Sequence, residues 1–372
     1  MTTSYSTLRT FILAQFAAES YLDGVIGAAP DMLERRLRLG SNNYRVTGDA
    51  EEASRVASLD GKIRMTDLQI RDFNARYRIV DHLSNTMSGF SATLMQHIAD
   101  DNGNPIQNGE YTLSFRSTEY PNDDRGGDWS RDGEADREIS NFGFAVAQIA
   151  DMEAYYRQLR SNDLLPAGAT FTVTGYSLGG HLATVFAEAH ETDAGFQGAV
   201  TFNAPGRGNL TGTARDLVNR AYDMLSSPSV GAVLQPASGG SIYLEGNFYT
   251  RSGGLRDQIL ASFGPPSGVG LSGAEQPLAG DKITQVYGRA DFDDTEWAAN
   301  AGIHSNNKVR LFIEDQPDIQ GFGPVTLFDT FSGLQSDFGT THSITLLADS
   351  LSVMELLQKL DSGVSELTMR GI

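Results

Sequence analysis

Apolar side chains recur every three or four residues in four stretches of the chain, which is the spacing of a helix that buries one face. The first stretch, residues 5–35, predicts one helix near the start of the chain. Residues 65–83 predict a second helix or a helix pair, and residues 139–159 predict a long helix. Residues 343–360 predict a last one.

Two segments, residues 88–98 and 109–119, alternate between apolar and polar residues, which is the period of a half-buried strand. Turn-forming residues join them, so we predict a β-hairpin. Four later segments predict further strands: "TFTVTG", "GAVTFNAP", "DKITQVYG" and "KVRLFIED". Between the first two, "GGHLATVFAEAH" predicts a helix. Strands and helices in this order predict an α/β fold, with a mostly parallel central sheet and helices on both faces.

Two polar stretches interrupt this pattern. Residues 119–138 are acidic and rich in turn-forming residues, and they predict a loop. Residues 205–280 are rich in Gly, Ser and Pro. A structureless loop of that length is improbable in a compact domain, so we expect helices there or a lid. We therefore predict a helical extension, residues 1–84, packed on one domain, residues 85–372, that carries the 205–280 insertion.

Composition narrows the classes of function. The 372 residues carry a net charge of −19, which repels nucleic-acid phosphates and argues against a nucleic-acid partner. The absence of cysteine excludes disulfides, thiolate metal sites and a cysteine nucleophile. No apolar run is long enough to span a bilayer, and the first twenty residues lack the basic start of a signal peptide. Direct export from a bacterial cell and residence in the cytoplasm both fit this composition.

The strongest chemical signal is "VTGYSLGGHLA", residues 173–183, where Ser177 has glycines two residues before and two residues after it. The predicted strand before it and helix after it are the setting of a nucleophile elbow, in which small neighbours let the backbone segments approach closely. The N–H of Leu178 would be one oxyanion donor. The alternative is that Ser177 only fills a tight turn, in a chain with 40 glycines.

A serine nucleophile needs a base. In the fold that carries a nucleophile elbow, the order of the catalytic residues along the chain is Ser, then Asp or Glu, then His. The chain has six histidines: His82, His97, His181, His190, His304 and His342. His342 lies in a loop immediately before the last predicted helix, where the base belongs, and is our first choice. His304 is the alternative, which we interpret as a loop or pocket-lining residue. His181 suits a packing or capping role early in the elbow helix, and His190 suits the negative end of that helix.

The acid should follow the strand that contains "ITQVYG", where the chain offers Asp291, Asp293 and Asp294. Asp291 is nearest the strand end and is our first choice, and the other two stay open. A second oxyanion donor should come from a loop after an earlier strand. The segment "YTLSFRSTE" ends in the small hydroxylic residues Ser117 and Thr118. We expect a backbone N–H from this segment, with the Thr118 hydroxyl as a helper.

Several of these segments together resemble the class 3 lipases, the fungal triacylglycerol lipase-like family. "FRST" resembles that family's "FRG[ST]" oxyanion segment, "VTGYSLGGHLA" resembles its "VTGHSLGGALA", and "VTFNAPG" resembles its strand after the elbow helix. Together with "HSITLLADSL", they resemble more specifically a bacterial branch of lipases and phospholipases A1. Members of that branch are often the front domain of calcium-repeat proteins that are exported directly from the cell. The motifs span residues 85–360.

The resemblance implies an α/β-hydrolase fold, and it implies a nucleophile, a base, an acid and two oxyanion donors at Ser177, His342, an Asp of residues 291–294, Leu178 and Thr118. The sequence departs from the family at two positions. Tyr176 replaces the usual His before the nucleophile, which changes a packing neighbour. Ser117 replaces the usual Gly, which either narrows the acyl pocket or adds a hydrogen bond.

These features predict a serine hydrolase that cleaves carboxylic esters of lipids through an acyl-enzyme, as a triacylglycerol lipase or a phospholipase A1. The alternatives are a short-chain or polymer esterase, an amidase or acyltransferase on the same residues, and a non-catalytic binding module. No cofactor is expected for the chemistry. The carboxylates of residues 128–136 predict a solvated loop, with a structural Ca²⁺ site as the alternative. The resemblance also implies secretion, and that this chain is the front of a longer exported protein.

Overall fold

The computed structural model describes residues 4–40, 65–100, 103–107, 109–119, 129–207, 212–226, 252–262, 282–287, 307–311 and 344–363. Seven strands within these residues form one sheet, and they follow the chain in order: β1 (Tyr77–Leu83), β2 (Ala92–His97), β3 (Tyr111–Phe115), β4 (Phe171–Tyr176), β5 (Phe196–Phe202), β6 (Ile283–Tyr287) and β7 (Asn307–Arg310). The pairs β1–β2 and β2–β3 are antiparallel, and each pair from β3 to β7 is parallel. The predicted hairpin and the mostly parallel sheet are confirmed.

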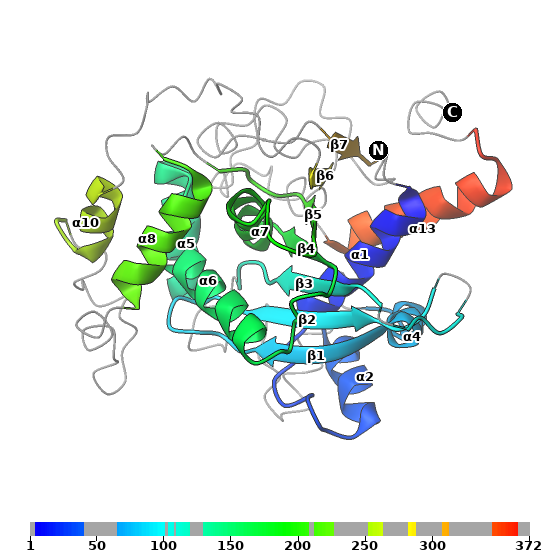
Figure 1. Cartoon of the computed structure of the whole chain (residues 1–372). Helices are drawn as coiled ribbons and strands as arrows, with labels where there is room; N and C mark the ends of the chain where they lie inside the picture. The colour runs from blue at the N-terminus through cyan, green and yellow to red at the C-terminus, as the bar shows by residue number, and fades with distance from the viewer. Residues whose placement is uncertain are drawn as a thin grey trace.

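Helices cover both faces of this sheet (Figure 1). One face carries α1 (Tyr5–Ala18), α4 (Asp67–Arg76) and α13 (Ile344–Leu360), with α2 (Pro30–Leu39) beside α4. The other face carries α5 (Trp129–Phe142), α6 (Val146–Ser161), α7 (Leu178–Ala189) and α8 (Ala214–Leu225), with α10 (Leu255–Ser262) beside α8. Figure 1 shows α1 and α13 side by side, so segments from the two ends of the chain pack together. The predicted α/β class is confirmed.

Each strand sends its side chains alternately to the two faces, because successive side chains of a strand point in opposite directions. In β2, Leu94 packs in the apolar cluster with α6 and α7, and Met95 packs in the cluster with α1 and α13. In β5, Ala199 packs in the first of these clusters and Val200 packs in the second. The sheet therefore has a buried apolar core on each side.

The predicted helix over residues 5–35 is wrong in its length, because the chain forms two helices there. Helix α1 ends at Ala18, and Gly24 and Gly27 then adopt left-handed backbone angles that a helix cannot continue through. Pro30 begins α2, where its missing N–H leaves no helical hydrogen bond unmade. The pattern of apolar residues carries across this break and so concealed it.

The second half of the helix predicted over residues 65–83 is a strand. Helix α4 ends at Arg76, and β1 begins at the next residue and pairs antiparallel with β2. Short apolar segments suit a helix or a strand equally well, and pairing with the neighbouring hairpin decides between them. Strand β1 thus lies inside the segment that we predicted as a helical extension.

The long helix predicted over residues 139–159 is also two helices. Helix α5 ends at Phe142, Gly143 adopts a φ of 69°, and α6 begins at Val146. The N–H of Gly143 donates to the Ile139 carbonyl (2.7 Å), which closes the last turn of α5. Helix α5 starts at Trp129, so the loop predicted over residues 119–138 is helical in its second half.

The 205–280 insertion contains the helices that its length led us to expect, namely α8 and α10. Much of the rest of the insertion is outside the described residues, so a lid there stays a prediction. Within the part of the chain that the structure describes, no helix combines the length and the apolar character needed to cross a membrane.

Candidate active site

Ser177 lies in the turn between strand β4 and helix α7. Its φ of 51° and ψ of −122° are rare for a residue other than glycine and cost about 1–3 kcal/mol. Hydrogen bonds hold this conformation: the Ser177 N–H donates to the Phe202 carbonyl of β5 (3.0 Å), and the Ser177 carbonyl accepts the Gly180 N–H (2.9 Å). The predicted strand–turn–helix setting is therefore confirmed, and the turn is strained.

Two glycines let separate backbone segments meet at this turn. A β-carbon on Gly175 would lie 2.0 Å from the carbonyl oxygen of Gly179. A β-carbon on Gly179 would lie 2.2 Å from the Phe115 carbonyl oxygen and 2.8 Å from that of Arg116. Both positions therefore need glycine for close approach of the backbone. The turn that carries Ser177 is in direct contact with the end of β3, where the predicted oxyanion segment begins.

Thr118 follows β3, which runs parallel to β4, so Thr118 and Ser177 lie at the same edge of the sheet. The Thr118 side chain is buried, and its hydroxyl donates to the Asp136 carboxylate of α5 (3.1 Å). The N–H of Glu119 donates to Asp132 of the same helix (2.7 Å). Leu178 carries one of the first N–H groups of α7, which have no acceptor inside the helix and favour negative charge. Both predicted oxyanion donors thus belong to segments that meet at the strained turn.

Helix α1 and the residue that caps its end contribute two buried polar side chains that sequence reasoning missed, Gln15 and Glu19. Glu19 accepts the hydroxyl of Ser117 (2.6 Å) and the N–H of the same residue (3.2 Å). Gln15 donates to the Phe115 carbonyl (2.8 Å). Of the two consequences expected for Ser117, the added hydrogen bond is present. The signal in the sequence was a Gln and a Glu four residues apart on an otherwise apolar helix face.

Burial raises the pKa of Glu19 to about 7, although hydrogen bonds from Ser117 and Gln15 and the nearby Arg116 guanidinium all lower it. Arg116 is itself buried, and it forms an ion pair with Glu119 and donates to Asn85 (2.5 Å). The oxyanion segment is therefore surrounded by paired charged groups.

His181, in the first turn of α7, is fully buried and bonded at both ring nitrogens. Its Nε2 accepts the Ala145 N–H (3.3 Å), so the proton is on Nδ1, which donates to the Gly206 carbonyl (2.7 Å). A neutral imidazole fixed in this way connects α7 to the start of α6 and to the loop after β5. This arrangement agrees with the packing or capping role expected for His181.

Two further histidines lie on the antiparallel strands. His82 of β1 shares a hydrogen bond with Thr93 (3.0 Å), and His97 of β2 stacks on Tyr77 with ring centroids 4.6 Å apart. Strand β3 separates both strands from β4, which leads to Ser177. Neither histidine is at the carboxyl end of β4.

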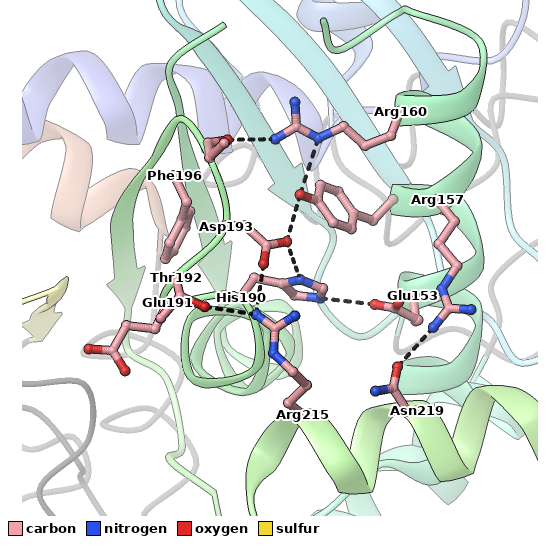
Figure 2. A network of polar contacts seen from close by, with 12 residues as sticks. Glu153, Arg157, Arg160, His190, Glu191, Thr192, Asp193, Phe196, Arg215 and Asn219 are labelled. Atoms are coloured by element: carbon pink, nitrogen blue, oxygen red, sulfur yellow. Dashed lines mark hydrogen bonds and ion pairs between the residues drawn. The ribbon is translucent and has the colours of Figure 1, made fainter. Parts of the chain in front are cut away.

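His190, at the end of α7, lies between two carboxylates (Figure 2). Its Nδ1 bonds Asp193 (2.8 Å) and its Nε2 bonds Glu153 of α6 (2.9 Å). Burial lowers the pKa of His190, but the hydrogen bonds to Asp193 and Glu153 outweigh it, so the net shift is upward. The charged imidazole suits the carboxyl end of α7, as the sequence suggested.

The remaining predicted triad residues lie outside the described residues: His304, His342, Asp291, Asp293 and Asp294. Strand β6, which precedes the aspartates, lies next to β5, and its Val286 carbonyl accepts the Asn203 N–H just beyond β5 (2.8 Å). Helix α13 begins at Ile344, two residues after His342, and Ile344 packs in the apolar cluster that includes Phe202. The described elements that flank these candidates thus pack around β5 and β6.

The carboxylates predicted to lie in a solvated loop are partly in helix α5, so that interpretation is wrong for residues 129–136. Asp132 and Asp136 are buried and accept hydrogen bonds from the oxyanion segment, and Asp132 also accepts the side-chain amide of Gln148 (2.8 Å). The described residues contain no group of three or more His, Asp or Glu side chains arranged to hold a metal ion. Asp128 is not among the described residues, and Ca²⁺ binding stays a prediction.

No known protein family and no curated protein matches this chain by sequence. Structural comparison finds similarity to an extracellular lipase from Serratia marcescens (15% identity, TM-score 0.32, 55% of this chain and 37% of the lipase). A lipase from Yarrowia lipolytica is also similar (10% identity, TM-score 0.34, 84% of this chain and 82% of the lipase). So is a thermophilic carboxylesterase from a metagenomic library (12% identity, TM-score 0.28, 88% of this chain and 98% of the esterase). The match thus spans little more than a third of the Serratia lipase. All three TM-scores are below 0.5, so the α/β-hydrolase fold is assigned on the sheet order and elbow of this chain.

Proposed function

We propose that this protein is a serine hydrolase that cleaves carboxylic esters, with Ser177 as its nucleophile. The observation that carries this proposal is the strained backbone of Ser177 in a strand-to-helix turn, pressed against the end of β3. A strain of about 1–3 kcal/mol at a residue that is not glycine is expected where function requires it. A serine that only filled the turn would be better replaced by glycine, which adopts positive φ without cost.

The proposed mechanism is acyl transfer through an acyl-enzyme. His342 takes the proton of the Ser177 hydroxyl as the oxygen attacks the ester carbonyl carbon, and Asp291 orients and stabilises the imidazolium. The N–H groups of Leu178 and Thr118 bind the oxyanion that forms. The imidazolium then protonates the departing alcohol as the ester C–O bond breaks. A water molecule, deprotonated by the same imidazole, releases the acid and restores the Ser177 hydroxyl.

The described histidines support His342 as the base. His82, His97, His181 and His190 each have a structural partner of their own. The two histidines left are His304 and His342, and His342 immediately precedes a helix, as the base does in this fold.

We propose lipid esters as the substrates, either triacylglycerol or phospholipid at the sn-1 position. This choice is supported by the resemblance of the "FRST" and "GYSLGGHLA" segments to lipases. Short-chain or polymer esters are the second candidate, because the same nucleophile, base and oxyanion donors would cleave them. An acyl-chain series of nitrophenyl esters, measured beside a phospholipid assay, separates these classes.

Labelling with a fluorophosphonate probe tests the chemistry. We expect the wild-type chain to be labelled and Ser177→Ala to be neither labelled nor active, with kcat reduced by at least about 10⁴-fold. His342→Ala should be reduced similarly, and His304→Ala, the matched control, should keep wild-type activity. Among Asp291→Asn, Asp293→Asn and Asp294→Asn, the first should show the large loss.

Equal labelling of wild type and Ser177→Ala would contradict the catalytic proposal. An inactive and unlabelled wild-type chain would favour the non-catalytic binding module. Loss of activity in His304→Ala but not in His342→Ala would exchange the roles of the two histidines.

A further inference from the structure

We propose that Glu19, together with Gln15, is a positioning residue for the oxyanion hole. Gln15 lies in the N-terminal helix α1 and Glu19 caps its end, on the face of the sheet opposite α5, and both bind the segment that ends in Thr118. This inference rests on the proposed function, because it assigns these residues a task in the same site.

The first observation is that the Glu19 carboxylate is directed at Ser117. It accepts the Ser117 hydroxyl at 2.6 Å and the Ser117 N–H at 3.2 Å, and the Gln15 side-chain amide donates to it at 2.7 Å. A distance of 2.6 Å is at the short end of the range for an O–H···O hydrogen bond. A buried carboxyl group is costly unless donors surround it, so these three bonds hold Glu19 and Ser117 in one arrangement.

The second observation is that carboxylates hold the backbone on both sides of the peptide that joins Ser117 to Thr118. The N–H before it, that of Ser117, donates to Glu19 from α1. The N–H after it, that of Glu119, donates to Asp132 from α5 (2.7 Å). The peptide that carries the Thr118 N–H therefore lies between two anchored peptides. Its orientation is set from helices on opposite faces of the sheet.

The third observation is that Gln15 connects the same helix to both strands beside the elbow. Its amide donates to the Phe115 carbonyl (2.8 Å), and its carbonyl oxygen accepts the Thr174 hydroxyl of β4 (2.8 Å). Thr174 in turn shares a hydrogen bond with Ser114 of β3 (2.7 Å). Helix α1 thus ties together the two strands that lead to Thr118 and Ser177.

Packing alone does not account for these polar residues. Leu8, Ile12 and Phe16 of the same helix are fully buried apolar side chains. The polar residues at positions 15 and 19 bond to the ends of β3 and β4, where the two strands approach the elbow. Catalytic hydrogen-bond donors must be held to within a fraction of an ångström, and a misplacement of about 1 Å costs on the order of 100-fold in rate.

The test separates the effect of side-chain length at position 19 from the effect of side-chain charge. Glu19→Gln keeps the length and can accept the Ser117 N–H while donating to the Ser117 hydroxyl. Glu19→Asp keeps the charge but withdraws the carboxylate, and Glu19→Ala removes it. We expect kcat for nitrophenyl butyrate to fall about 10- to 100-fold in the Asp and Ala variants and to stay within about 3-fold in the Gln variant, with KM within about 2-fold throughout.

Glu110→Ala is the matched control. Glu110 immediately precedes β3, at the opposite end from the oxyanion segment, and it also accepts a hydroxyl, that of Thr172 (2.5 Å). Its removal should leave kcat per folded molecule unchanged, with the folded fraction measured by circular dichroism. The rate of fluorophosphonate labelling should follow kcat across the Glu19 series, because the phosphonate oxygen occupies the oxyanion hole.

Wild-type kcat in Glu19→Asp, or a loss in Glu19→Gln equal to that in Glu19→Ala, would overturn the inference and leave the proposed function intact. If Glu19→Ala does not fold, the comparison of the Gln and Asp variants decides. A wild-type chain that neither hydrolyses the ester nor labels at Ser177 would remove the proposed function, and this inference with it.

Discussion

At the scale of single residues, the candidate site depends on two glycines beside Ser177, because the backbone segments around them leave no room for a β-carbon. Ser177 adopts a φ of 51° in a turn where Gly175 and Gly179 leave space for backbone. The Phe115 carbonyl, which would lie 2.2 Å from a β-carbon on Gly179, also accepts the amide of Gln15 from the other side. The end of β3 therefore lies between the elbow and α1, and a methyl group on Gly179 would have to displace it and strain its hydrogen bond to Gln15.

Gly179→Ala tests this crowding. The added β-carbon should force the end of β3 away from the elbow, destabilise the protein by about 1–3 kcal/mol and reduce kcat more than it changes KM. Denaturant unfolding and ester hydrolysis measure the two effects. Gly168→Ala is the control, because its β-carbon would meet no atom within 4 Å. Equal stability and activity of the two variants would contradict the crowding.

At the scale of elements, helices α6 and α7 are joined by the polar network around His190 (Figure 2). Glu153 of α6 and Asp193, just beyond α7, both bond the imidazole, and Asp193 also pairs with Arg215 of α8 (2.7 Å). Tyr156 of α6 packs against the imidazole with ring centroids 4.6 Å apart. The buried imidazole of His190 therefore connects α7 to α6 through Glu153, and to α8 through Asp193 and Arg215.

The raised pKa of His190 predicts a stability that depends on pH. A histidine whose pKa is higher in the folded protein contributes its full stabilisation below the ordinary value near 6.5, and this stabilisation is lost as the pH rises through the folded value. We expect His190→Gln to lower the free energy of unfolding by about 1.5–3 kcal/mol at pH 6 and by less at pH 9. Urea unfolding at both pH values measures this difference. A loss of stability in His190→Gln that grows with pH would contradict the raised pKa of His190.

At the scale of the whole molecule, one face of the sheet is closed by helices from the two ends of the chain. Helix α1 packs against α13 and across β2 to β5, and Leu8, Ile12 and Phe16 fill the space between them. The same helix holds the oxyanion segment through Gln15 and Glu19. The N-terminal segment is therefore part of the core that positions the candidate site.

Phe16→Ala tests this role of the N-terminal helix. Phe16 is 1% exposed, so its truncation leaves a cavity and should cost about 3–5 kcal/mol, a large part of the stability of a typical domain. Leu68, on α4 and 66% exposed, is the control, and Leu68→Ala should change stability by less than about 0.5 kcal/mol. Thermal and denaturant unfolding measure both. A loss in Phe16→Ala as small as that in Leu68→Ala would contradict the role of α1 in the core.

Local patterns sufficed to predict the elements whose neighbours in sequence are also their partners in space. The hairpin of β2 and β3 and the strand and helix around Ser177 follow from short-range periodicity and turn residues. Periodicity failed between Ala18 and Pro30, at Tyr77 and at Gly143, where apolar spacing continues through a change of element. A glycine in a left-handed conformation or a pairing with a neighbouring strand made the decision at those points.

The sequence by itself determined the α/β class and the identity of the candidate nucleophile, because a G-x-S-x-G turn between a strand and a helix is a local feature. Only the tertiary structure decided which side chains hold the oxyanion segment. Gln15 and Glu19 are about a hundred residues from Phe115 and Ser117 along the chain, and they meet because α1 crosses the ends of β3 and β4. A buried carboxylate is stable only where hydrogen-bond donors surround it, and here the fold brings those donors from a distant part of the chain. A local sequence pattern does not contain this information.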